Sequence, residues 1–446
     1  MPDDISVDGR SPIVKWQAPP NALAQAIRDA GVRRAYIITD PTSGELRGSL
    51  KALDEVIERL REHPDYFAHQ GCFFELGAES GHLLSATIHK TRRGQAAGGV
   101  RFWRYETLGE FIRDGLRLAR GMGQKNALAG LWWGGGKGVI ARQDAVDHKN
   151  PELRAKIYRD YGRFMTGLRG CYVTAEDVGT TPPDMANIFV TTRHTTCIPE
   201  VVGGSGNPSQ LTARGVVVGM EAALDQLGMG GLEGKSVALQ GLGNVSGFMV
   251  AELLERKVAK VIGADIDQGV IDELLAAHPG APLELRVVGL DDMSILAESV
   301  DVVAPNATGA TINPKTIPTI RAKVVCGAAN NQLELAERDG RALRDGGVLY
   351  VPDFLTNRMG IVNCANEAYG SFEGDPAIQA HLEREPEHGI FARAQQVFAR
   401  ATASGRSTAE EAETLAEELM AAPHPIWPDR AQQIIDSLVA SGWDRG

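Results

Sequence analysis

Hydrophobic positions along the chain follow two different periods. The segments LDEVIERLREH (53–63) and TAEEAETLAEELM (408–420) repeat apolar residues at helical spacing, which predicts two helices. Short apolar runs at 34–39 and 86–90 predict strands. Because helical segments and apolar runs alternate over residues 1 to about 100, the pattern predicts an α/β domain in the first half of the chain.

Three helix starts carry local signals. Thr107 and Glu110 have the spacing of a capping box, and the helix that they open is predicted to end near Gly121. Asn150 followed by proline, and Thr181 followed by proline, combine an N-cap residue with proline at the first helical position. Each of these pairs predicts another helix.

From Gly234 onward the pattern becomes more regular. Apolar runs rich in Val and Ile alternate with helical segments, and they read KSVALQ, VAKVIGAD, DVVAP, KVVCGAAN and GVLYVPD. A parallel sheet covered on both faces requires such runs, so we predict a doubly wound, Rossmann-type domain. The predicted organisation is therefore residues 1–205 as a substrate-binding and oligomerisation domain, 206–365 as the doubly wound domain, and 366–446 as helices that return to the first domain.

Length, charge and cysteine spacing exclude several classes of function. A chain of 446 residues is long enough for two domains, and its net charge of −11 disfavours nucleic acid or an anionic membrane as a partner. No stretch has the length and apolarity of a membrane span, and the N-terminal residues lack the pattern of a signal peptide, which predicts a cytoplasmic protein. The five cysteines are far apart, so we expect reduced thiols and no metal site: Cys72, Cys171, Cys197, Cys326 and Cys364.

A glycine loop lies between an apolar run and a helical segment in VALQGLGNVSGFMVAELL. Gly241 and Gly243 permit a tight turn and let backbone amides approach a pyrophosphate at the start of the following helix. Ser246 stands where the third glycine of this fingerprint is expected, and it is small enough to leave the loop possible. The loop predicts a dinucleotide site.

Asp265 ends the next apolar run, 24 residues after Gly241. A carboxylate at this place accepts hydrogen bonds from a ribose diol and repels a 2′-phosphate, and no arginine or lysine stands between Ile266 and Val270. NAD is therefore the predicted cofactor. The alternative is a turn with a solvated aspartate, which the flanking run, helix and acid together disfavour.

Two lysines bracket a segment of aliphatic, tryptophan and glycine residues. Lys125 and Lys137 enclose a sequence that predicts an apolar wall, in which burial lowers the pKa of a lysine, and the three glycines before Lys137 allow close approach to a ligand. Two surface lysines beside a glycine turn are the alternative. Asp177 follows an apolar run and suits either an acid/base role or a turn.

A series of motifs spans about residues 90–370, in the order RRGQAAGGVRF, LARGMGQK, WGGGKGVI, TAEDVGTTPPDM, GLGNVS, GAANNQL and NRMGIVNCANEAYG. Together they resemble the leucine/phenylalanine/valine branch of the Glu/Leu/Phe/Val dehydrogenase family. The resemblance implies a homo-oligomeric enzyme that uses NAD to deaminate an L-amino acid reversibly to a 2-oxo acid and ammonia. The first 80 or so residues match this pattern poorly.

The resemblance also assigns roles to residues of this chain. It makes Lys125 the anchor of the substrate carboxylate, Lys137 the catalytic lysine that activates water, and Asp177 the group that exchanges protons with the amino group. It places Gly98 and Gly99 against the substrate backbone. The cofactor-binding residues are then Gly241, Leu242, Gly243, Asn244, Val245, Ser246, Asp265, Ile266, Asn306, Ala307, Asn330 and Asn331, and Asn330 also contacts the substrate.

The predicted substrate has an apolar side chain. Glutamate dehydrogenases use a lysine and a serine to hold the distal carboxylate, and here Ala97 and Cys364 stand at those positions. Neither neutralises a carboxylate, which is costly to bury unpaired. Departures from the family pattern leave the identity of the amino acid open, because they fall near the predicted pocket or cofactor: Asn306, Thr308, Arg358 and Met359. Either Asn363 or Arg358 could reach into the pocket and select a polar side chain.

Other functions stay possible from the sequence. A glutamate dehydrogenase shares the chemistry, and a catalytically inactive regulator that binds NAD or an amino acid shares the fold. Retention of Lys125, Lys137 and Asp177 together argues against the inactive regulator. A 2-hydroxy-acid dehydrogenase would need a histidine–carboxylate pair, and none of the ten histidines lies in the motifs.

Overall fold

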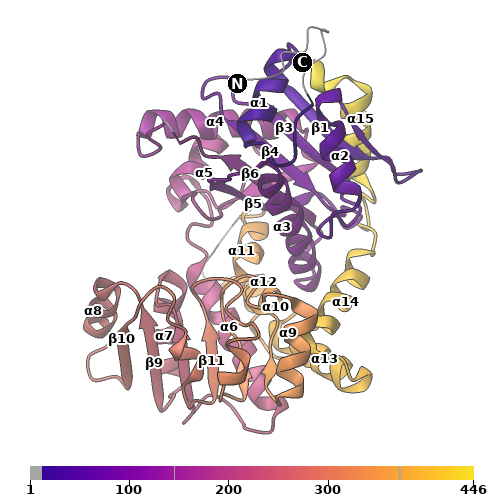
Figure 1. Cartoon of the computed structure of the whole chain (residues 1–446). Coiled ribbons are helices and arrows are strands. Elements are labelled where there is room, and N and C mark those ends of the chain that lie inside the picture. Colours follow the sequence, from indigo (N-terminus) through magenta and orange to yellow (C-terminus); the bar gives the residue numbers. More distant parts are fainter. Residues whose placement is uncertain (1–12, 145, 371, 373) are drawn as a thin grey trace. The chain divides into compact units, whose positions relative to one another are not determined.

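The computed structural model describes residues 13–144, 146–370, 372 and 374–446, and it divides into two compact units (Figure 1). Unit 1 comprises the chain up to Ala127, Trp132–Gly206 and Met420–Gly446, and unit 2 comprises Leu128–Leu131 and Asn207–Leu419. The division after Gly206 lies next to the boundary expected at 205. The C-terminal segment is shared, because residues 366–419 belong to unit 2 and residues 420–446 to unit 1.

Unit 1 is built on a seven-stranded sheet in the order β2-β1-β3-β4-β6-β5-β7. The pairings from β2 to β6 are antiparallel, and β5 lies parallel to both β6 and β7. The strands are β1 (Arg34–Thr39), β2 (Leu46–Gly48), β3 (Gly71–Leu76), β4 (Leu83–Ile88), β5 (Ala96–Trp103), β6 (Gly134–Ala141) and β7 (Tyr172–Ala175). The runs at 34–39 and 86–90 thus correspond to β1 and to the end of β4, followed by two residues outside it.

The helix starts of unit 1 follow their local sequence signals. Thr107 and Glu110 form the predicted capping box, and the Asn150 side chain accepts hydrogen bonds from the next helix's first amides. Thr181 caps a further helix together with Asp184. The helices are α1 (Pro20–Asp29), α2 (Asp54–Arg61), α3 (Leu108–Leu128), α4 (Pro151–Gly167), α5 (Pro182–Phe189) and α15 (Arg430–Ala440).

The predicted end of α3 near Gly121 is wrong, because the helix continues to Leu128. Its glycines serve packing instead. A Cβ on Gly123 would lie 2.8 Å from the sulfur of Met420 and 3.3 Å from the Cα of Gly135 in β6, so only glycine lets helix and strand approach this closely. A Cβ on Gly121 would meet nothing within 4 Å.

The C-terminal residues complete the core of unit 1. Trp443, only 5% exposed, packs edge-on against Phe73 of β3 at 5.4 Å between ring centroids and lies 6.2 Å from Phe164 of α4. The guanidinium of Arg34 stands 5.0 Å from the centre of the same ring. Burial of such an aromatic side chain contributes strongly to stability, so residues 420–446 are part of this unit's core.

Unit 2 contains the predicted doubly wound sheet. Its six strands are all parallel, in the order β10-β9-β8-β11-β12-β13. The strands are β8 (Ser236–Gln240), β9 (Lys260–Asp265), β10 (Leu283–Val287), β11 (Val302–Pro305), β12 (Val324–Val325) and β13 (Leu349–Tyr350). The helices are α6 (Ser209–Gln226), α7 (Asn244–Glu255), α8 (Gln268–Ala277), α9 (Ala336–Asp345), α10 (Asp353–Thr356), α11 (Met359–Glu367), α12 (Pro376–Gln379), α13 (Ile390–Ser404) and α14 (Thr408–Met420).

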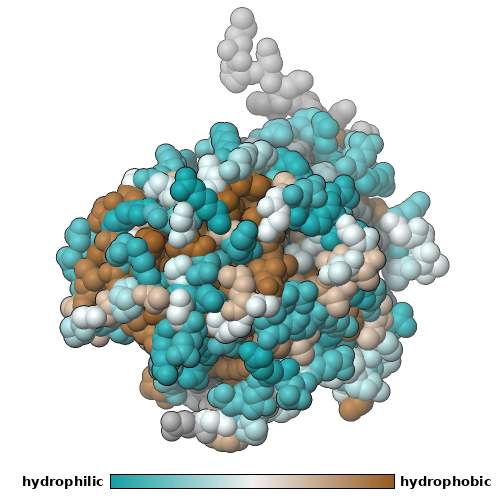
Figure 2. Space-filling view, turned by 90° about the horizontal axis from the view of Figure 1, so that it is seen from below, coloured by the Kyte–Doolittle hydropathy of each residue, from teal (hydrophilic) through white to brown (hydrophobic). Residues whose placement is uncertain are grey.

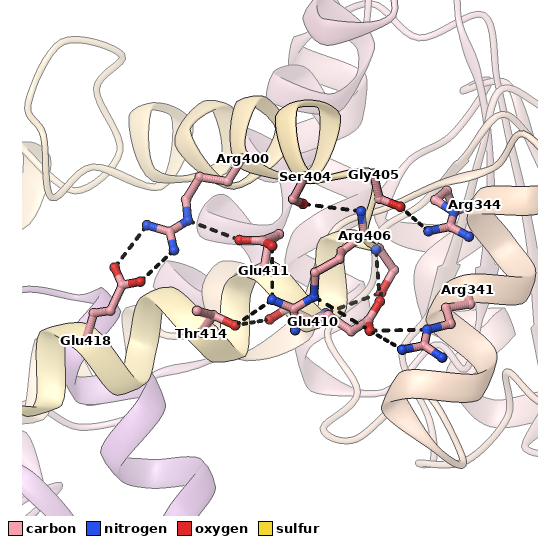
Figure 3. A network of polar contacts seen from close by, with 11 residues as sticks. Arg341, Arg344, Arg400, Ser404, Gly405, Arg406, Glu410, Glu411, Thr414 and Glu418 are labelled. Carbon is pink, nitrogen blue, oxygen red and sulfur yellow. Dashed lines mark hydrogen bonds and ion pairs between the residues drawn. The ribbon is translucent and has the colours of Figure 1, made fainter.

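An ion-pair network joins α14 to its neighbours α9 and α13 (Figure 3). Ser407 and Glu410 form a capping box at the start of α14, and Arg341 of α9 donates to Glu410 at 2.8 Å. Burial raises the pKa of Glu410, but the hydrogen bonds from Arg341 and Ser407 outweigh it and lower the pKa to about 2. Arg400 of α13 also binds Glu411 of α14. The helix predicted at 408–420 is therefore present and held at its first turn.

The surface mixes polar and apolar side chains. Figure 2 shows apolar side chains interrupted by polar ones on the face seen from below. Exposed apolar residues of unit 2 include Leu227, Ile266 and Leu290. Among the described residues no helix is long and apolar enough to cross a membrane.

The cysteines agree with the sequence only in part. Cys72, Cys171 and Cys326 are buried free thiols, and burial raises the pKa of each. A raised thiol pKa makes these side chains poor nucleophiles. Cys197 and Cys364 are not free thiols, so the prediction of reduced thiols is wrong for these two residues.

Candidate active site

Unit 1 contains a buried ion pair between two of the predicted catalytic residues. Lys137 of β6 has a side chain only 3% exposed, and its Nζ lies 2.9 Å from Oδ2 of Asp177, which follows β7. Burial is the largest influence on the pKa of Lys137 and lowers it; the carboxylate of Asp177 opposes this effect, but the pKa stays lowered. For Asp177, burial raises the pKa, but the positive charges of Lys137 and Arg101 outweigh burial and hold it at about 2. The alternative of two surface lysines is wrong for Lys137.

Glycines on β5 make room for this ion pair. β5 lies between β6 and β7, and a Cβ on Gly99 would lie 2.7 Å from Cβ of Asp177 and 2.4 Å from the carbonyl oxygen of Glu176. A Cβ on Gly98 would lie 1.9 Å from the carbonyl oxygen of Gly136. Any larger residue at either place would therefore push the neighbouring backbone away and separate the pair.

The glycines that precede Lys137 form part of β6 instead of a turn. A Cβ on Gly135 would lie 2.2 Å from the carbonyl oxygen of Ala119 in α3, and one on Gly136 would lie 2.6 Å from the ring of Tyr172. At these two positions glycine leaves room for α3 and for the ring of Tyr172. Trp132 does not belong to the predicted apolar wall, because it is 44% exposed and contacts the guanidinium of Arg93.

A chain of hydrogen-bonded polar residues next to Asp177 was not predicted from the sequence. Nε of Arg101 donates to Oδ2 of Asp177 at 2.9 Å, and Nη1 donates to Asp114 of α3 at 3.0 Å. The hydroxyl of Tyr105 donates to the same Asp114 at 2.6 Å. Arg101 stands two residues after Gly99 on β5, so strand alternation was a usable signal, because it places both on one face of the strand.

Glu176, the neighbour of Asp177, was also missed. One of its carboxylate oxygens is buried and has no hydrogen-bond partner among the described residues. Burial, with the nearby charges of Asp184 and Asp177, raises the pKa of Glu176 to about 7. A carboxyl group that titrates near neutral pH beside a buried ion pair is typical of functional sites.

Three other residues predicted to bind the substrate have definite places in the fold. Lys125 lies on α3, half-buried, and Ala97 is fully buried in β5 next to Gly98. Both belong to unit 1, with Lys137 and Asp177. Cys364 is buried in α11 of unit 2.

The glycine loop of unit 2 has the geometry that its sequence predicts. It connects β8 to α7, and Gly241 has a φ of +89°, where a Cβ would also lie 2.6 Å from Cβ of Ala307. Space above Gly243 is open, since a Cβ there would meet nothing within 4 Å. Oδ2 of Asp265, at the end of β9, accepts a hydrogen bond of 2.6 Å from the amide of Leu242, which holds the carboxylate against the loop.

Ser246 takes a specific part in this loop. Its hydroxyl donates to the carbonyl oxygen of Gly241 at 2.7 Å and accepts from Nδ2 of Asn306 at 3.0 Å. Oδ1 of Asn306 accepts from the amide of Ala328 at 2.7 Å. The serine in the third fingerprint position therefore links the glycine loop to the segments that follow β11 and β12.

The other predicted cofactor residues also lie in unit 2. Asn330 accepts a hydrogen bond of 2.9 Å from Asn357, and the amide of Asn331, which has a φ of 54°, donates to Asp353 at 2.8 Å. Asn244 and Val245 are in the first turn of α7, and Ile266, 58% exposed, follows Asp265. A free helix N-terminus, an open glycine and a carboxylate at the next strand end fit a dinucleotide.

Arg358 does not act as the sequence allowed. Its side chain is fully buried, and it donates to the carbonyl oxygens of Leu128 and His388. Burial lowers its pKa to about 9. Because the guanidinium binds backbone carbonyls, it is not available to a substrate side chain. Met359 is buried as well, at the start of α11.

Comparison with known proteins extends over most of the chain. Residues 80–194 match the family model described as Glu/Leu/Phe/Val dehydrogenase, dimerisation domain, and residues 203–274 match that described as Glutamate/Leucine/Phenylalanine/Valine dehydrogenase. A leucine dehydrogenase of Geobacillus stearothermophilus is 39% identical over 360 residues, which cover 80% of this chain and 92% of the relative. A valine dehydrogenase of Streptomyces albus is 38% identical over 362 residues, which cover 80% of this chain and 94% of the relative.

Solved structures show the same architecture. The L-tryptophan dehydrogenase from Nostoc punctiforme has a TM-score of 0.64 and 30% identity, and the match covers 82% of this chain and 97% of that one. The hetero-hexameric glutamate dehydrogenase from Thermus thermophilus is similar in fold, with a TM-score of 0.62 at 21% identity over 87% of this chain and 88% of that one. With motifs, site geometry and relatives in agreement, the chain belongs to the Glu/Leu/Phe/Val dehydrogenase family.

Proposed function

We propose that this protein is an NAD-dependent L-amino-acid dehydrogenase that converts an amino acid with an apolar side chain reversibly to its 2-oxo acid and ammonia. The observation that carries the proposal is the buried Lys137–Asp177 pair at 2.9 Å. An amine and a carboxylate in contact, shielded from water, supply the proton transfers that deamination requires. The relatives named as leucine, valine and tryptophan dehydrogenases support this reaction class.

The residues of unit 1 take the following parts in the proposed mechanism. Lys125 anchors the α-carboxylate of the substrate by its positive charge. Lys137, whose pKa burial lowers, takes a proton from the water that attacks the imine carbon and stabilises the resulting carbinolamine. Asp177 exchanges a proton with the amino group as ammonia leaves, and Gly98 and Gly99 lie against the substrate backbone. The residues around the glycine loop of unit 2 would hold the nicotinamide cofactor, which would supply the hydride chemistry of the reaction.

The residues of unit 2 support a preference for NAD over NADP. Asp265 is fixed beside the glycine loop, where its carboxylate suits a ribose diol and repels a 2′-phosphate. Asn306, Ala307, Asn330 and Asn331 complete the proposed cofactor surface. We expect Asp265→Ala to lower the ratio of kcat/KM with NAD to kcat/KM with NADP. Equal kcat/KM for both cofactors in the wild-type enzyme would contradict the preference.

The proposal also concerns which substrate side chain the enzyme accepts. Ala97 is buried and uncharged, so it offers no partner for a distal carboxylate, and Cys364 likewise carries no positive charge. Burying an unpaired carboxylate is costly, so glutamate should be a poor substrate. Because Arg358 is bound to backbone carbonyls, its charge does not change this expectation.

A homo-oligomer is part of the proposal. The region 80–194 matches a model described as a dimerisation domain, which supports self-association of unit 1. Size-exclusion chromatography with light scattering gives the subunit number directly. A monomer at all concentrations would contradict this part and leave the reaction unaffected.

One assay tests the reaction and the substrate together. The decrease of NADH absorbance is followed with ammonia and a panel of 2-oxo acids, namely those of leucine, valine, phenylalanine, tryptophan and glutamate. We expect turnover with at least one apolar member and a much lower kcat/KM for 2-oxoglutarate. Preference for 2-oxoglutarate would instead identify a glutamate dehydrogenase. Retained NADH binding with no turnover on any member would support an inactive regulator.

A further inference from the structure

We propose that Arg101 is a positioning residue that holds the carboxylate of Asp177 against Lys137 and sets the pH range in which Lys137 works. This inference rests on the proposed function, because it concerns the same ion pair. It concerns a side chain that the motifs did not single out, two residues after the paired glycines of β5.

The geometry makes Arg101 a fixed third member of the pair. Its Nε and the Nζ of Lys137 each lie 2.9 Å from the same oxygen, Oδ2 of Asp177. The two nitrogens are therefore at most about 5.8 Å apart, a range in which charges shift each other's pKa values. The other side of the guanidinium is held by Asp114 at 3.0 Å, which Tyr105 in turn contacts at 2.6 Å. Arg101 cannot turn away without breaking both carboxylate contacts.

In addition to burial, two neighbouring charges of opposite sign, those of Asp177 and Arg101, change the pKa of Lys137. The charged and titratable groups around it are Asp177 after β7, Arg101 on β5 and Asp114 on α3, with Tyr172 of β7 facing Asp177. Burial lowers the pKa of Lys137, Asp177 raises it, and Arg101 lowers it again. Without Arg101 the carboxylate would draw a proton onto Lys137 and keep it charged at higher pH, where a charged lysine cannot accept a proton from water.

A surface cavity gives access to this arginine from the outside. The cavity has a volume of about 300 Å³, and its wall includes Arg101 and Asp114 together with Arg104, Arg113 and Arg117. Truncation of Arg101 to alanine would leave a space of guanidinium size between Asp114 and Asp177 that adjoins this cavity. A small cation from solvent can enter such a space.

Two substitutions separate the charge of Arg101 from its geometry. Arg101→Gln removes the charge, so we expect the rise of kcat/KM with pH to move up by about one pH unit or more. Arg101→Lys keeps a positive charge but cannot contact both carboxylates at once, so the profile should stay near that of the wild type while kcat falls about tenfold or more. Arg104→Gln is the control, because Arg104 lines the same cavity and pairs with Asp144 at 2.9 Å, outside the ion pair.

Chemical rescue supplies a readout that a merely structural role would not give. We expect guanidinium or methylguanidinium, at millimolar concentration, to raise the activity of Arg101→Ala saturably, at least tenfold, and to return its pH profile toward that of the wild type. Potassium at the same ionic strength should have no such effect. Circular dichroism of each variant verifies the fold. If the alanine variant does not fold, the pH profile and kcat of Arg101→Lys test the role of Arg101 instead.

A measurement without turnover separates this inference from the proposed function. Competitive acetylation of Lys137, followed by mass spectrometry across pH, reports its pKa in the wild type and in Arg101→Gln. An unchanged titration of Lys137 together with an unchanged pH profile would overturn the role of Arg101. If the wild type deaminates no amino acid and the titration of Lys137 still shifts upward in the variant, the inference stands and the proposed function fails.

Discussion

Burial and neighbouring charges decide what individual side chains of this protein can do. Lys137 and Asp177 were identifiable from the sequence because their motifs resemble those of a family, whereas local sequence alone left Asp177 open between a turn and an acid/base role. Strand alternation places Arg101 on the same face of β5 as Gly99, but its contact with Asp114 of α3 is visible only in the fold. Glu176 was missed for a related reason, since its burial depends on elements remote in sequence.

Glu176 predicts a measurable pH dependence of stability. Its pKa is raised from 4.5 to about 7 in the folded state, so the folded protein loses stability as pH rises from about 4.5 to 7 and Glu176 ionises in its buried position. Glu176→Gln carries no charge, so we expect it to be more stable than the wild type at pH 8, by about 1–2 kcal/mol after allowance for partial exposure, and equal to it near pH 4.5.

Urea unfolding at pH 4.5 and at pH 8 measures this difference. Glu58→Gln is a matched control on α2, because Glu58 is exposed and its substitution should change little at either pH. If the advantage of Glu176→Gln is the same at both pH values, ionisation of Glu176 is not its cause.

At the scale of elements, the first residues of helices were predictable from the sequence, whereas the last residue of α3 was not. Caps at Thr107, Asn150 and Thr181 use side chains a few residues away, so a short stretch of sequence contains all the information. The length of α3 and the strand nature of the glycines before Lys137 depend on tight contacts between α3 and β6. In a single stretch of sequence, glycine indicates the end of a helix or strand. In α3 and β6 it instead allows the two elements to approach each other closely.

Two glycines of α3 should therefore respond oppositely to alanine. At Gly121 a Cβ meets nothing within 4 Å, so Gly121→Ala should raise the free energy of unfolding by about 0.5–1 kcal/mol through helix propensity. At Gly123 a Cβ would crowd the backbone of Gly135 and the sulfur of Met420, so Gly123→Ala should lower it. Thermal unfolding of the two variants gives the comparison, and equal stabilisation by both would show that α3 does not press on β6.

At the scale of the whole molecule, the sheet of unit 2 was predictable and that of unit 1 was not. Runs of Val and Ile buried on both faces identify parallel strands without knowledge of their partners. The mixed sheet of unit 1 pairs β4 with β6 and β5 with β7, and those pairings depend on contacts between distant segments. The pattern of single strands does not contain that information.

The proposed catalytic step and cofactor binding should be separable by mutation, because Lys137 and Asp265 belong to different units. We expect Lys137→Ala to lower kcat by about 10²–10⁴-fold while NADH binding, measured by fluorescence titration, stays within about twofold of the wild type. Asp265→Ala should weaken NADH binding and keep most of kcat at saturating NADH. Lys156→Ala, an exposed position on α4, is the control.

Either of two results would refute this division. A Lys137→Ala enzyme that keeps a tenth of wild-type activity would show that Lys137 is not the catalytic lysine. Loss of NADH binding in the same variant would show that the effects of the two units are not separable.

The return of residues 420–446 to unit 1 has a consequence for the nascent chain. When Leu419 has been synthesised, every residue of unit 2 is present, but unit 1 still lacks Trp443, which packs against Phe73 and Phe164. All residues of unit 2 are therefore synthesised before unit 1, which begins the chain, is complete. Until the final segment emerges, the apolar surface that Trp443 covers stays exposed, and a chaperone that binds nascent apolar surface would find it there.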